Sequence, residues 1–249
     1  KFLYQMLKNC NSKSYEINKS RMVRVSNFSK KCLLELEKDE DIFYEQRKQG
    51  SLLLFKSTKQ IENIKKDLTL LEKLNIQHEL LDLNDCIQTE PGLHHVKSEF
   101  IAGLRFANDC TGNCYLFTNQ LYKKCLEMGV KFEFNTQIED IQIEKERISS
   151  IKTNRGEFDS DSYVVALGSY SSKILSKVGI NIPVYPVKGY SITLPVLNNK
   201  DAPQSTIIDD TFKIGITRLG NNIRVAGTAH LTGYNLELRE KSLSLLKYG

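Results

Sequence analysis

The residues with the clearest chemical potential lie around Gly168. Residues 163–167 form a short, apolar, β-branched run that is typical of a strand buried on both faces. Gly168 ends this run, and residues 169–172 supply cap residues for a helix expected over 173–178. Open α/β sheets bind ligands where a strand gives way to a helix, because free N–H groups and the helix dipole converge there. Since a glycine also lets a flat ligand approach the backbone, the pattern predicts a ligand site at this corner.

Several segments around this corner resemble one family. The sequence VVALG at 164–168 looks like the second flavin-contacting signature of the FAD-dependent amine oxidoreductases related to D-amino-acid oxidase. The sequence VYPVKGY at 184–190 is similar to that family's return strand into the substrate domain. Residues 108–114 and 206–210 extend the similarity over nearly the whole chain, most closely to the D-amino-acid dehydrogenases of the small-subunit type. The coverage, rather than any single motif, makes the match specific.

The resemblance implies oxidative deamination of D-amino acids. Hydride would move from the α-carbon to the flavin of FAD, and the imino acid would hydrolyse to a 2-oxo acid and ammonia. The electrons would pass to a quinone or another acceptor. Two alternatives stay open. An oxygen-using amino-acid or amine oxidase of the same family shares these motifs, and a non-catalytic truncated remnant would act at most as a binding module.

Carried onto this sequence, the family's cofactor contacts fall on two regions. Ile138 would lend backbone contacts to the adenine end of FAD, although a core isoleucine explains that residue equally well. The other cofactor-binding candidates are Ala166, Leu167, Gly168 and Gly189. No catalytic side chain and no metal ligand is predicted, because the flavin carries the chemistry.

The implied substrate sets the requirements for its own site. Its carboxylate needs a cation, and arginine suits this role because its planar guanidinium pairs with two oxygens. The site also needs an apolar wall over the flavin, and tyrosine suits this role because its ring is apolar while its hydroxyl can still form a hydrogen bond. We therefore expect Tyr190, Arg218 and His230 to contact the substrate. A solvated arginine at a strand edge and a loop histidine without a role are the alternatives for the last two.

One expected motif is absent from the sequence. The 14 glycines contain no G-x-G-x-x-G, the loop that cradles the FAD pyrophosphate. In the relatives that loop opens the protein, and a glycine-rich segment near the C-terminus closes over the flavin. The chain is therefore expected to be an internal fragment that lacks both segments, or the product of a truncated or split gene.

Periodicity predicts the elements that position the site. Residues 1–36 are helical in pattern, with one apolar face formed by Met22, Val25, Phe28, Cys32 and Leu36. Ser57 and Gln60 fit a capping box at the start of a second helix. Further helices are expected at 84–90, 115–128, 173–178 and 236–248. Strands are expected at 50–55, 78–81, 102–108, 130–134, 163–167, 188–196, 211–217 and 222–226, with a meander at 138–144, 148–153 and 157–158.

These elements predict an α/β (α+β) fold. It would comprise part of a Rossmann-like FAD-binding domain and an antiparallel-sheet substrate domain with helices. The helix, glycine and strand at 115–134 should lie beside 163–167 in the parallel layer. We expect the N-terminal helices and the first part of the substrate domain in residues 1–108, the partial FAD-binding domain in 109–182 and the second part of the substrate domain in 183–249.

Composition excludes several other classes. The 40% hydrophobic and 26% charged residues are ordinary for a globular protein. The net charge of +5 is dispersed, so nucleic-acid binding is not indicated. Six irregularly spaced cysteines indicate reduced, mostly buried thiols in the cytoplasm.

The first 31 residues are strongly basic. Against the single acid Glu16 stand Lys1, Lys8, Lys13, Lys19, Arg21, Arg24, Lys30 and Lys31. A solvated helix surface is the simpler interpretation. The alternative is a peripheral contact with the anionic inner membrane.

Overall fold

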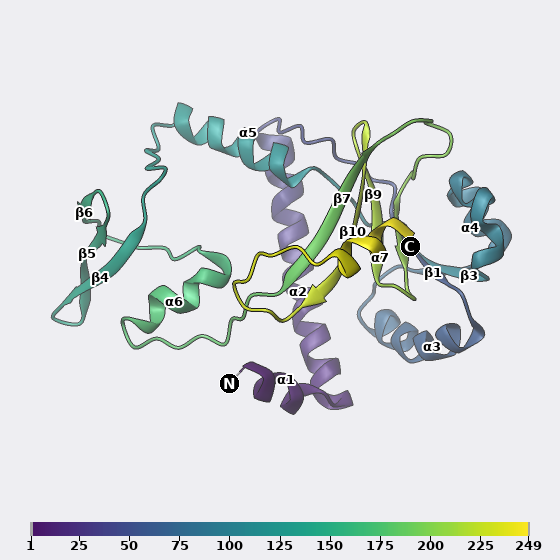
Figure 1. The fold of residues 1–249 in the computed structure, drawn as a ribbon, viewed down its shortest axis with the longest axis horizontal. Helices are drawn as coiled ribbons and strands as arrows, with labels where there is room; N and C mark the ends of the chain where they lie inside the picture. Colours follow the sequence, from purple (N-terminus) through teal and green to yellow (C-terminus); the bar gives the residue numbers. More distant parts are fainter. Residues whose placement is uncertain (1, 249) are drawn as a thin grey trace.

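A seven-stranded sheet forms the larger part of the molecule, described here for residues 2–248 from a computed structural model (Figure 1). Its strand order is β2-β3-β1-β8-β9-β10-β7, and only β1 and β8 run parallel. The strands are β1 (Ser51–Phe55), β2 (Glu79–Asp82), β3 (Ala102–Phe106), β7 (Lys188–Pro195), β8 (Thr206–Asp209), β9 (Ile214–Leu219) and β10 (Asn222–His230). Strands from both sides of the middle segment therefore join in one sheet, and the predicted mixed fold with a largely antiparallel sheet is confirmed.

A second, smaller sheet lies at the opposite side of the molecule from α3 and α4 (Figure 1). It is the predicted antiparallel meander of β4 (Ile138–Glu144), β5 (Arg147–Thr153) and β6 (Gly156–Phe158). Lys145 and Glu146 take positive φ angles of 49° and 64° in the first turn, as in the two-residue hairpin turns that match strand twist.

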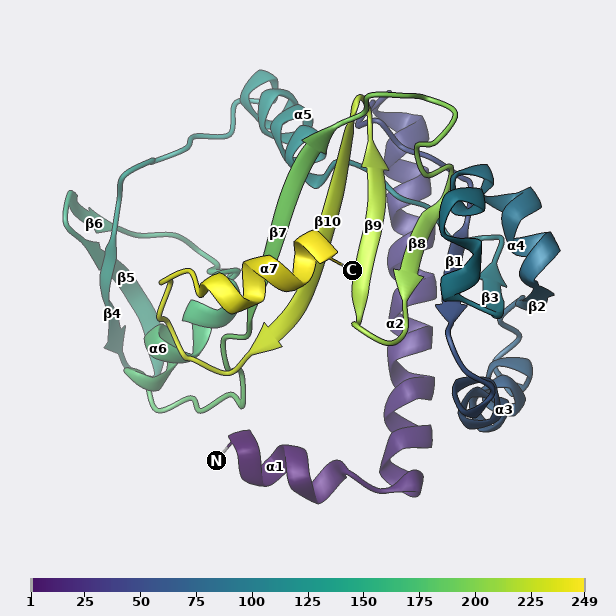
Figure 2. The ribbon, with the colours of Figure 1, turned by 45° about the vertical axis from the view of Figure 1, so that its right-hand side comes forward.

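Helices cover the large sheet on both faces. In Figure 2, α7 crosses in front of β7 and β10, and the long α2 runs behind the sheet. The helices are α1 (Phe2–Asn9), α2 (Ser12–Asp39), α3 (Thr58–Lys73), α4 (Leu83–Thr89), α5 (Cys114–Glu127), α6 (Ser171–Ser176) and α7 (Glu240–Tyr248), with 3-10 helices η1 (Pro91–Glu99) and η2 (Gly168–Tyr170). None of the helices within residues 2–248 is long and apolar enough to cross a membrane.

The N-terminal helical segment is divided into two helices. Asn11 has an extended backbone, and its side chain accepts a hydrogen bond from the Ser14 N–H at 2.9 Å, so a new helix begins there. Lys1 lies outside the described residues. The capping box of Ser57 and Gln60 is present at the start of α3, as predicted.

The core consists of three apolar clusters, each formed where a helix packs on the large sheet. Those under α3 and α4 are centred on Leu104 and Leu52. The third packs Leu246 of α7 against Tyr190, Ile214 and Val225. Burial of each such aliphatic side chain contributes about 1.5–3 kcal/mol, so α7 is held firmly on β7 and β10.

The expectation of mostly buried cysteines is wrong. Only Cys86 is buried among the six, which are all free thiols. Burial, with the nearby charges of Asp82 and Asp85, raises the pKa of Cys86 to about 11. Cys10, Cys32 and Cys114 are exposed.

Two predicted strands are not formed. Residues 130–134 and 163–167 pair with no strand within the described chain, and Val164 is 91% exposed. A parallel strand exists only through hydrogen bonds to neighbouring strands, so an apolar run without them has no regular structure. The predicted apolar face of α2 is likewise uncovered, with Met22, Val25 and Phe28 all more than 60% exposed.

Candidate functional site

The backbone at the predicted corner opens onto free space. Gly168 has a φ of +54°, a conformation that L side chains rarely adopt. A Cβ placed on it would meet no described atom within 4 Å. Gly168 begins η2, which leads directly into α6. A flat ligand can therefore approach this turn closely from outside.

A cavity of about 640 Å³ lies beside this corner. Leu167 and Ile138 both line it, so the structure brings together two cofactor-binding candidates that are distant in sequence. Its remaining lining residues are Thr136, Gln137, Glu139, Tyr170, Lys173, Ile174 and Lys177. Lys173 on α6 and Lys177 at the C-cap of this helix lie one turn apart and bring positive charge to the cavity, and Lys177 Nζ donates to Glu139 O.

The apolar residues before Gly168 face the small sheet. Val165 and Leu167, with Ile141 and Ile151 of the meander, line a second cavity of about 60 Å³. Ala166 is exposed between them. The meander therefore supports the corner from one side only, and leaves Gly168 open.

Two of the three substrate-binding candidates lie together at one end of the large sheet. Tyr190 is only 4% exposed, within the cluster under α7. Its ring centroid is 5.3 Å from that of His230, and its Oη accepts a hydrogen bond from the Arg239 N–H at 3.4 Å. Burial raises the pKa of Tyr190, but the Lys188 ammonium and the Arg239 N–H lower it by more, so the net pKa lies below its ordinary value. Gly189 lies beside them, exposed on β7.

Unpaired polar atoms gather at the same end of β10. Thr228 Oγ1, His230 Nδ1 and Thr232 Oγ1 are buried without a hydrogen-bond partner in the described chain. On the other side of its ring, His230 Nε2 is 3.4 Å from Ser242 Oγ. Because buried polar groups normally find partners, this row can bind water or the polar groups of a ligand.

The third candidate, Arg218, lies elsewhere. It pairs with Ile223 across the hairpin, whereas Tyr190 pairs with Gly227, four residues further along β10. At about 3.3 Å per residue, this separates the two positions by about 13 Å. Arg218 instead bonds Gly220 O at 3.0 Å and Asn199 Oδ1 at 2.7 Å, so the structure does not bring it to Tyr190 and His230.

The sequence analysis missed Tyr234, which connects the two groups of candidates. Its Oη donates to Ser169 O at 2.8 Å, directly after Gly168, while its own segment follows β10. The signal in the sequence was an aromatic residue directly after Gly233, and in the structure this glycine has a φ of +61°. A glycine followed by a tyrosine in a polar loop can indicate a turn, after which the aromatic ring contacts another helix or strand.

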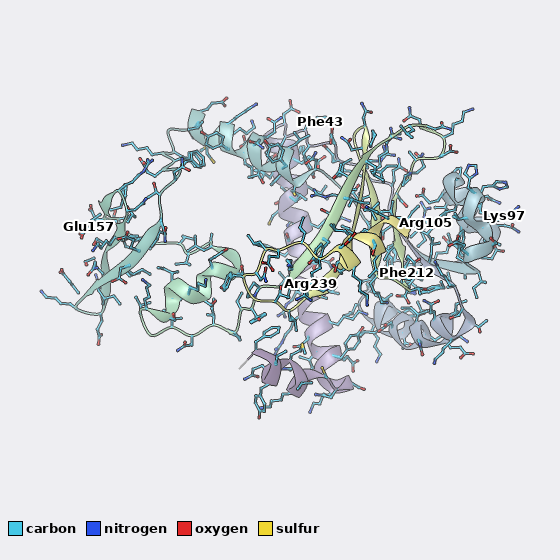
Figure 3. The ribbon with its side chains drawn as sticks, in the orientation of Figure 1. Phe43, Lys97, Arg105, Glu157, Phe212 and Arg239 are labelled. Carbon is cyan, nitrogen blue, oxygen red and sulfur yellow. The ribbon has the colours of Figure 1, made fainter. Side chains whose placement is uncertain are left out.

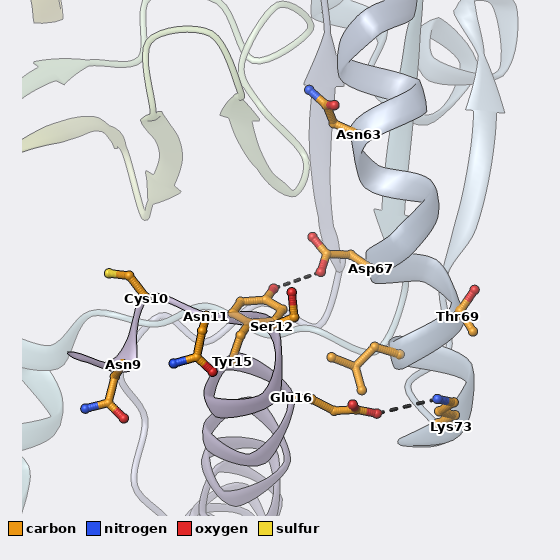
Figure 4. A pocket seen from close by; sticks show the side chains of 11 residues that line it. Asn9, Cys10, Asn11, Ser12, Tyr15, Glu16, Asn63, Asp67, Thr69 and Lys73 are labelled. Atoms are coloured by element: carbon orange, nitrogen blue, oxygen red, sulfur yellow. Dashed lines mark hydrogen bonds and ion pairs between the residues drawn. The ribbon is translucent and has the colours of Figure 1, made fainter. Parts of the chain in front are cut away.

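Another cavity, of about 850 Å³, lies between the start of α2 and α3 (Figure 4). Tyr15 Oη donates to Asp67 at 2.8 Å there, and Lys73 pairs with Glu16 at 3.4 Å. Its polar side chains bond one another across a wide groove, so it is a helix junction rather than a part of the site.

Comparison with known proteins identifies one family. The family model described as FAD dependent oxidoreductase (DAO) matches residues 5–246. A D-amino acid dehydrogenase of Vibrio atlanticus (strain LGP32) is 45% identical over 237 residues, which cover 95% of this chain and 57% of that protein. The chain therefore spans little more than half the length of this curated relative.

Solved structures share the fold. L-proline dehydrogenase from P. horikoshii matches with a TM-score of 0.76 at 21% identity, over 88% of this chain and 59% of that one. Glycine oxidase from Bacillus cereus ATCC 14579 matches with a TM-score of 0.74 at 19% identity, over 94% and 61% of the two chains. At these identities the similarity concerns the fold alone.

Proposed function

This chain belongs to the FAD dependent oxidoreductase family, and from that premise we propose that it is part of an enzyme that oxidatively deaminates D-amino acids. The observation that carries the proposal is the 45% identity to a D-amino acid dehydrogenase over 95% of this chain. The substrate would be a D-amino acid and the products a 2-oxo acid and ammonia, with a quinone or another acceptor taking the electrons.

We propose that the cavity beside Gly168 binds part of FAD. The fit rests on the open, positive-φ glycine, with Ala166 and Leu167 before it and with Ile138 and Leu167 both lining the cavity. Lys173 and Lys177 supply positive charge for a phosphate group. FAD, when bound, would accept the hydride from the α-carbon of the substrate.

We propose that the substrate site lies between this corner and the nearby end of β7 and β10. Gly189 there allows close approach, and Tyr190 and His230 shape the wall behind it. The unpaired His230 Nδ1 supports a polar contact at this end. Arg218 stays a prediction, and its place near the β9–β10 turn favours a structural role.

We propose residues 109–182 as the partial cofactor-binding domain, and residues 1–108 and 183–249 as the two parts of the substrate domain. The pairing of β1 with β8 supports this division, because it joins the two flanking segments in one sheet. The meander between them forms a sheet of its own.

A chimera tests the function directly. In it, this chain replaces the matched segment of the Vibrio atlanticus dehydrogenase. We expect D-alanine, but not L-alanine, to bleach its flavin absorbance, and a quinone analogue to reoxidise it faster than air does. Fast reoxidation in air would instead identify an oxidase. A folded chimera that binds FAD and is reduced by no amino acid would contradict the proposal.

We further propose that α1 contacts an anionic membrane surface. Leu3, Tyr4 and Leu7 are each more than half exposed on this helix. Lys8 and Lys13 form no ion pair within the described residues. Exposed apolar residues beside unpaired cations are typical of helices that lie in the membrane interface.

Vesicle co-sedimentation measures this contact. We expect the chain to bind vesicles containing phosphatidylglycerol several-fold more strongly than pure phosphatidylcholine, since each cation contributes about 1 kcal/mol near an anionic surface. The double variant Leu3→Asp/Leu7→Asp should lose the binding. Leu197→Asp is the matched control, because Leu197 is 94% exposed in a loop far from α1 in the chain. Binding that does not depend on anionic lipid would leave a solvated helix surface as the better interpretation.

A further inference from the structure

Residues 231–239, which we call the strap, connect β10 to α7 by way of the Gly168 corner. In Figure 1 the strap leaves the large sheet, passes next to α6 and returns to α7. Its Tyr234 donates a hydrogen bond to Ser169 O at 2.8 Å. The strap therefore contacts the proposed cofactor site, although one of its ends continues from β10 and the other leads into α7, which packs on the large sheet.

A lysine strengthens this contact. Lys173 Nζ on α6 is 3.5 Å from the ring centroid of Tyr234 and 5.3 Å from that of Tyr170. The two rings are 4.9 Å apart at an angle of 39°. One cation thus contacts an aromatic ring from each side of the junction, an attraction that strengthens as the groups are withdrawn from water.

The other end of the strap is fixed to β7. Lys188 Nζ donates to Glu237 O at 2.6 Å, and the Arg239 N–H donates to Tyr190 Oη. Figure 3 shows Arg239 where the strap meets α7. A continuous set of contacts therefore runs from Ser169 through Tyr234 and Glu237 to Lys188 and Tyr190.

We propose that the strap positions the Gly168 corner relative to the large sheet, with Tyr234 and Lys173 as its positioning residues. This role of the strap rests on the proposed function. Hydride transfer requires the cofactor and the substrate to be held at a fixed distance and angle, and small displacements lower the rate strongly. The corner lies on one side of this junction and the end of β7 on the other. The Tyr234 contacts are the means by which the strap fixes their spacing.

Hydrogen–deuterium exchange of the full chain without FAD tests the strap itself. Tyr234→Phe removes the hydroxyl, and Lys173→Met removes the charge while keeping the stem. We expect the amides of residues 168–176 to exchange about three- to tenfold faster in each variant, and Lys173→Arg to restore the slow rate. Tyr115→Phe is the matched control, since Tyr115 is 72% exposed on α5. Rates at 168–176 equal to the control, or faster exchange confined to the strap, would overturn the proposal.

The chimera separates this inference from the function. Tyr234→Phe should change the visible circular dichroism of bound flavin, which reports ring orientation, while Tyr115→Phe should not. Tyr234→Phe is the deciding variant, because Lys173 itself lines the proposed cofactor cavity. Faster exchange at 168–176 in a chimera that binds no FAD would refute the proposed function and leave the strap standing. A flavin-loaded chimera with unchanged exchange and dichroism in the Tyr234→Phe variant would refute the strap.

Discussion

The chimera is expected to bind FAD about 100-fold more tightly than the 249-residue chain does alone. The FAD pyrophosphate is normally held by a glycine-rich loop at a helix N-terminus, and the sequence contains no G-x-G-x-x-G. Each charge-assisted hydrogen bond contributes roughly 1.5–3 kcal/mol, so the loss of two accounts for the difference. Titration monitored by the quenching of flavin fluorescence measures both dissociation constants.

A pair of glycine variants connects this result to the corner. Gly168 and Gly129 both have positive φ angles, +54° and +85°, and a Cβ on either meets no described atom within 4 Å. Alanine therefore strains both backbones by similar amounts, but only Gly168 lies beside the proposed cofactor cavity. In the chimera, Gly168→Ala should weaken FAD binding about tenfold and Gly129→Ala hardly at all. Equal losses in the two variants would contradict the proposed role of Gly168, and tight FAD binding by the isolated chain would contradict the first expectation.

Local signals in the sequence predicted most of the elements. The capping box before α3, its apolar stripe and the alternation of the meander depend on residues close in sequence, so they can be recognised without the fold. The helix after Gly168 was predicted in the same way, and α6 begins at Ser171 within the expected cap residues, whereas the ligand site at this corner stays a prediction. The family resemblance then added Ile138, which the structure brings to the same cavity as Leu167.

What the sequence could not predict depends on distant partners. Residues 163–167 have the composition of a buried strand, but a strand also needs neighbours, and none lies alongside within the described chain. The sequence predicts Tyr190 in the wall of the substrate site, but in the structure α7, which begins some fifty residues later in the chain, packs over it. The register of the β9–β10 hairpin, which places Arg218 away from Tyr190, cannot be predicted from a local pattern either. The same holds for the hydrogen bond between Tyr234 and Ser169, because the two residues are far apart in sequence.

Glu90→Ala is expected to destabilise the chain by about 3 kcal/mol, which lowers Tm by roughly 6–12 °C in a protein of this size. Glu90 is 1% exposed. Its carboxylate accepts hydrogen bonds from the Gln204 N–H at 2.8 Å, from the Ser205 N–H at 2.5 Å and from the Ser205 hydroxyl. Truncation leaves these buried donors without an acceptor, and each unpaired donor lowers the free energy of unfolding by more than the net contribution of a typical hydrogen bond. Thermal unfolding followed by circular dichroism measures the change.

The position of Glu90 explains why this loss should affect the whole sheet. Gln204 and Ser205 immediately precede β8, the strand whose parallel pairing with β1 joins the two halves of the large sheet. Glu90→Gln should recover only part of the stability, because its amide nitrogen would face N–H donors. Glu62→Ala, at an exposed position on α3, is the control and should change Tm by less than about 2 °C. A Glu90→Ala variant as stable as this control would mean that the apolar contacts of Ile207 suffice to hold β8 against β1.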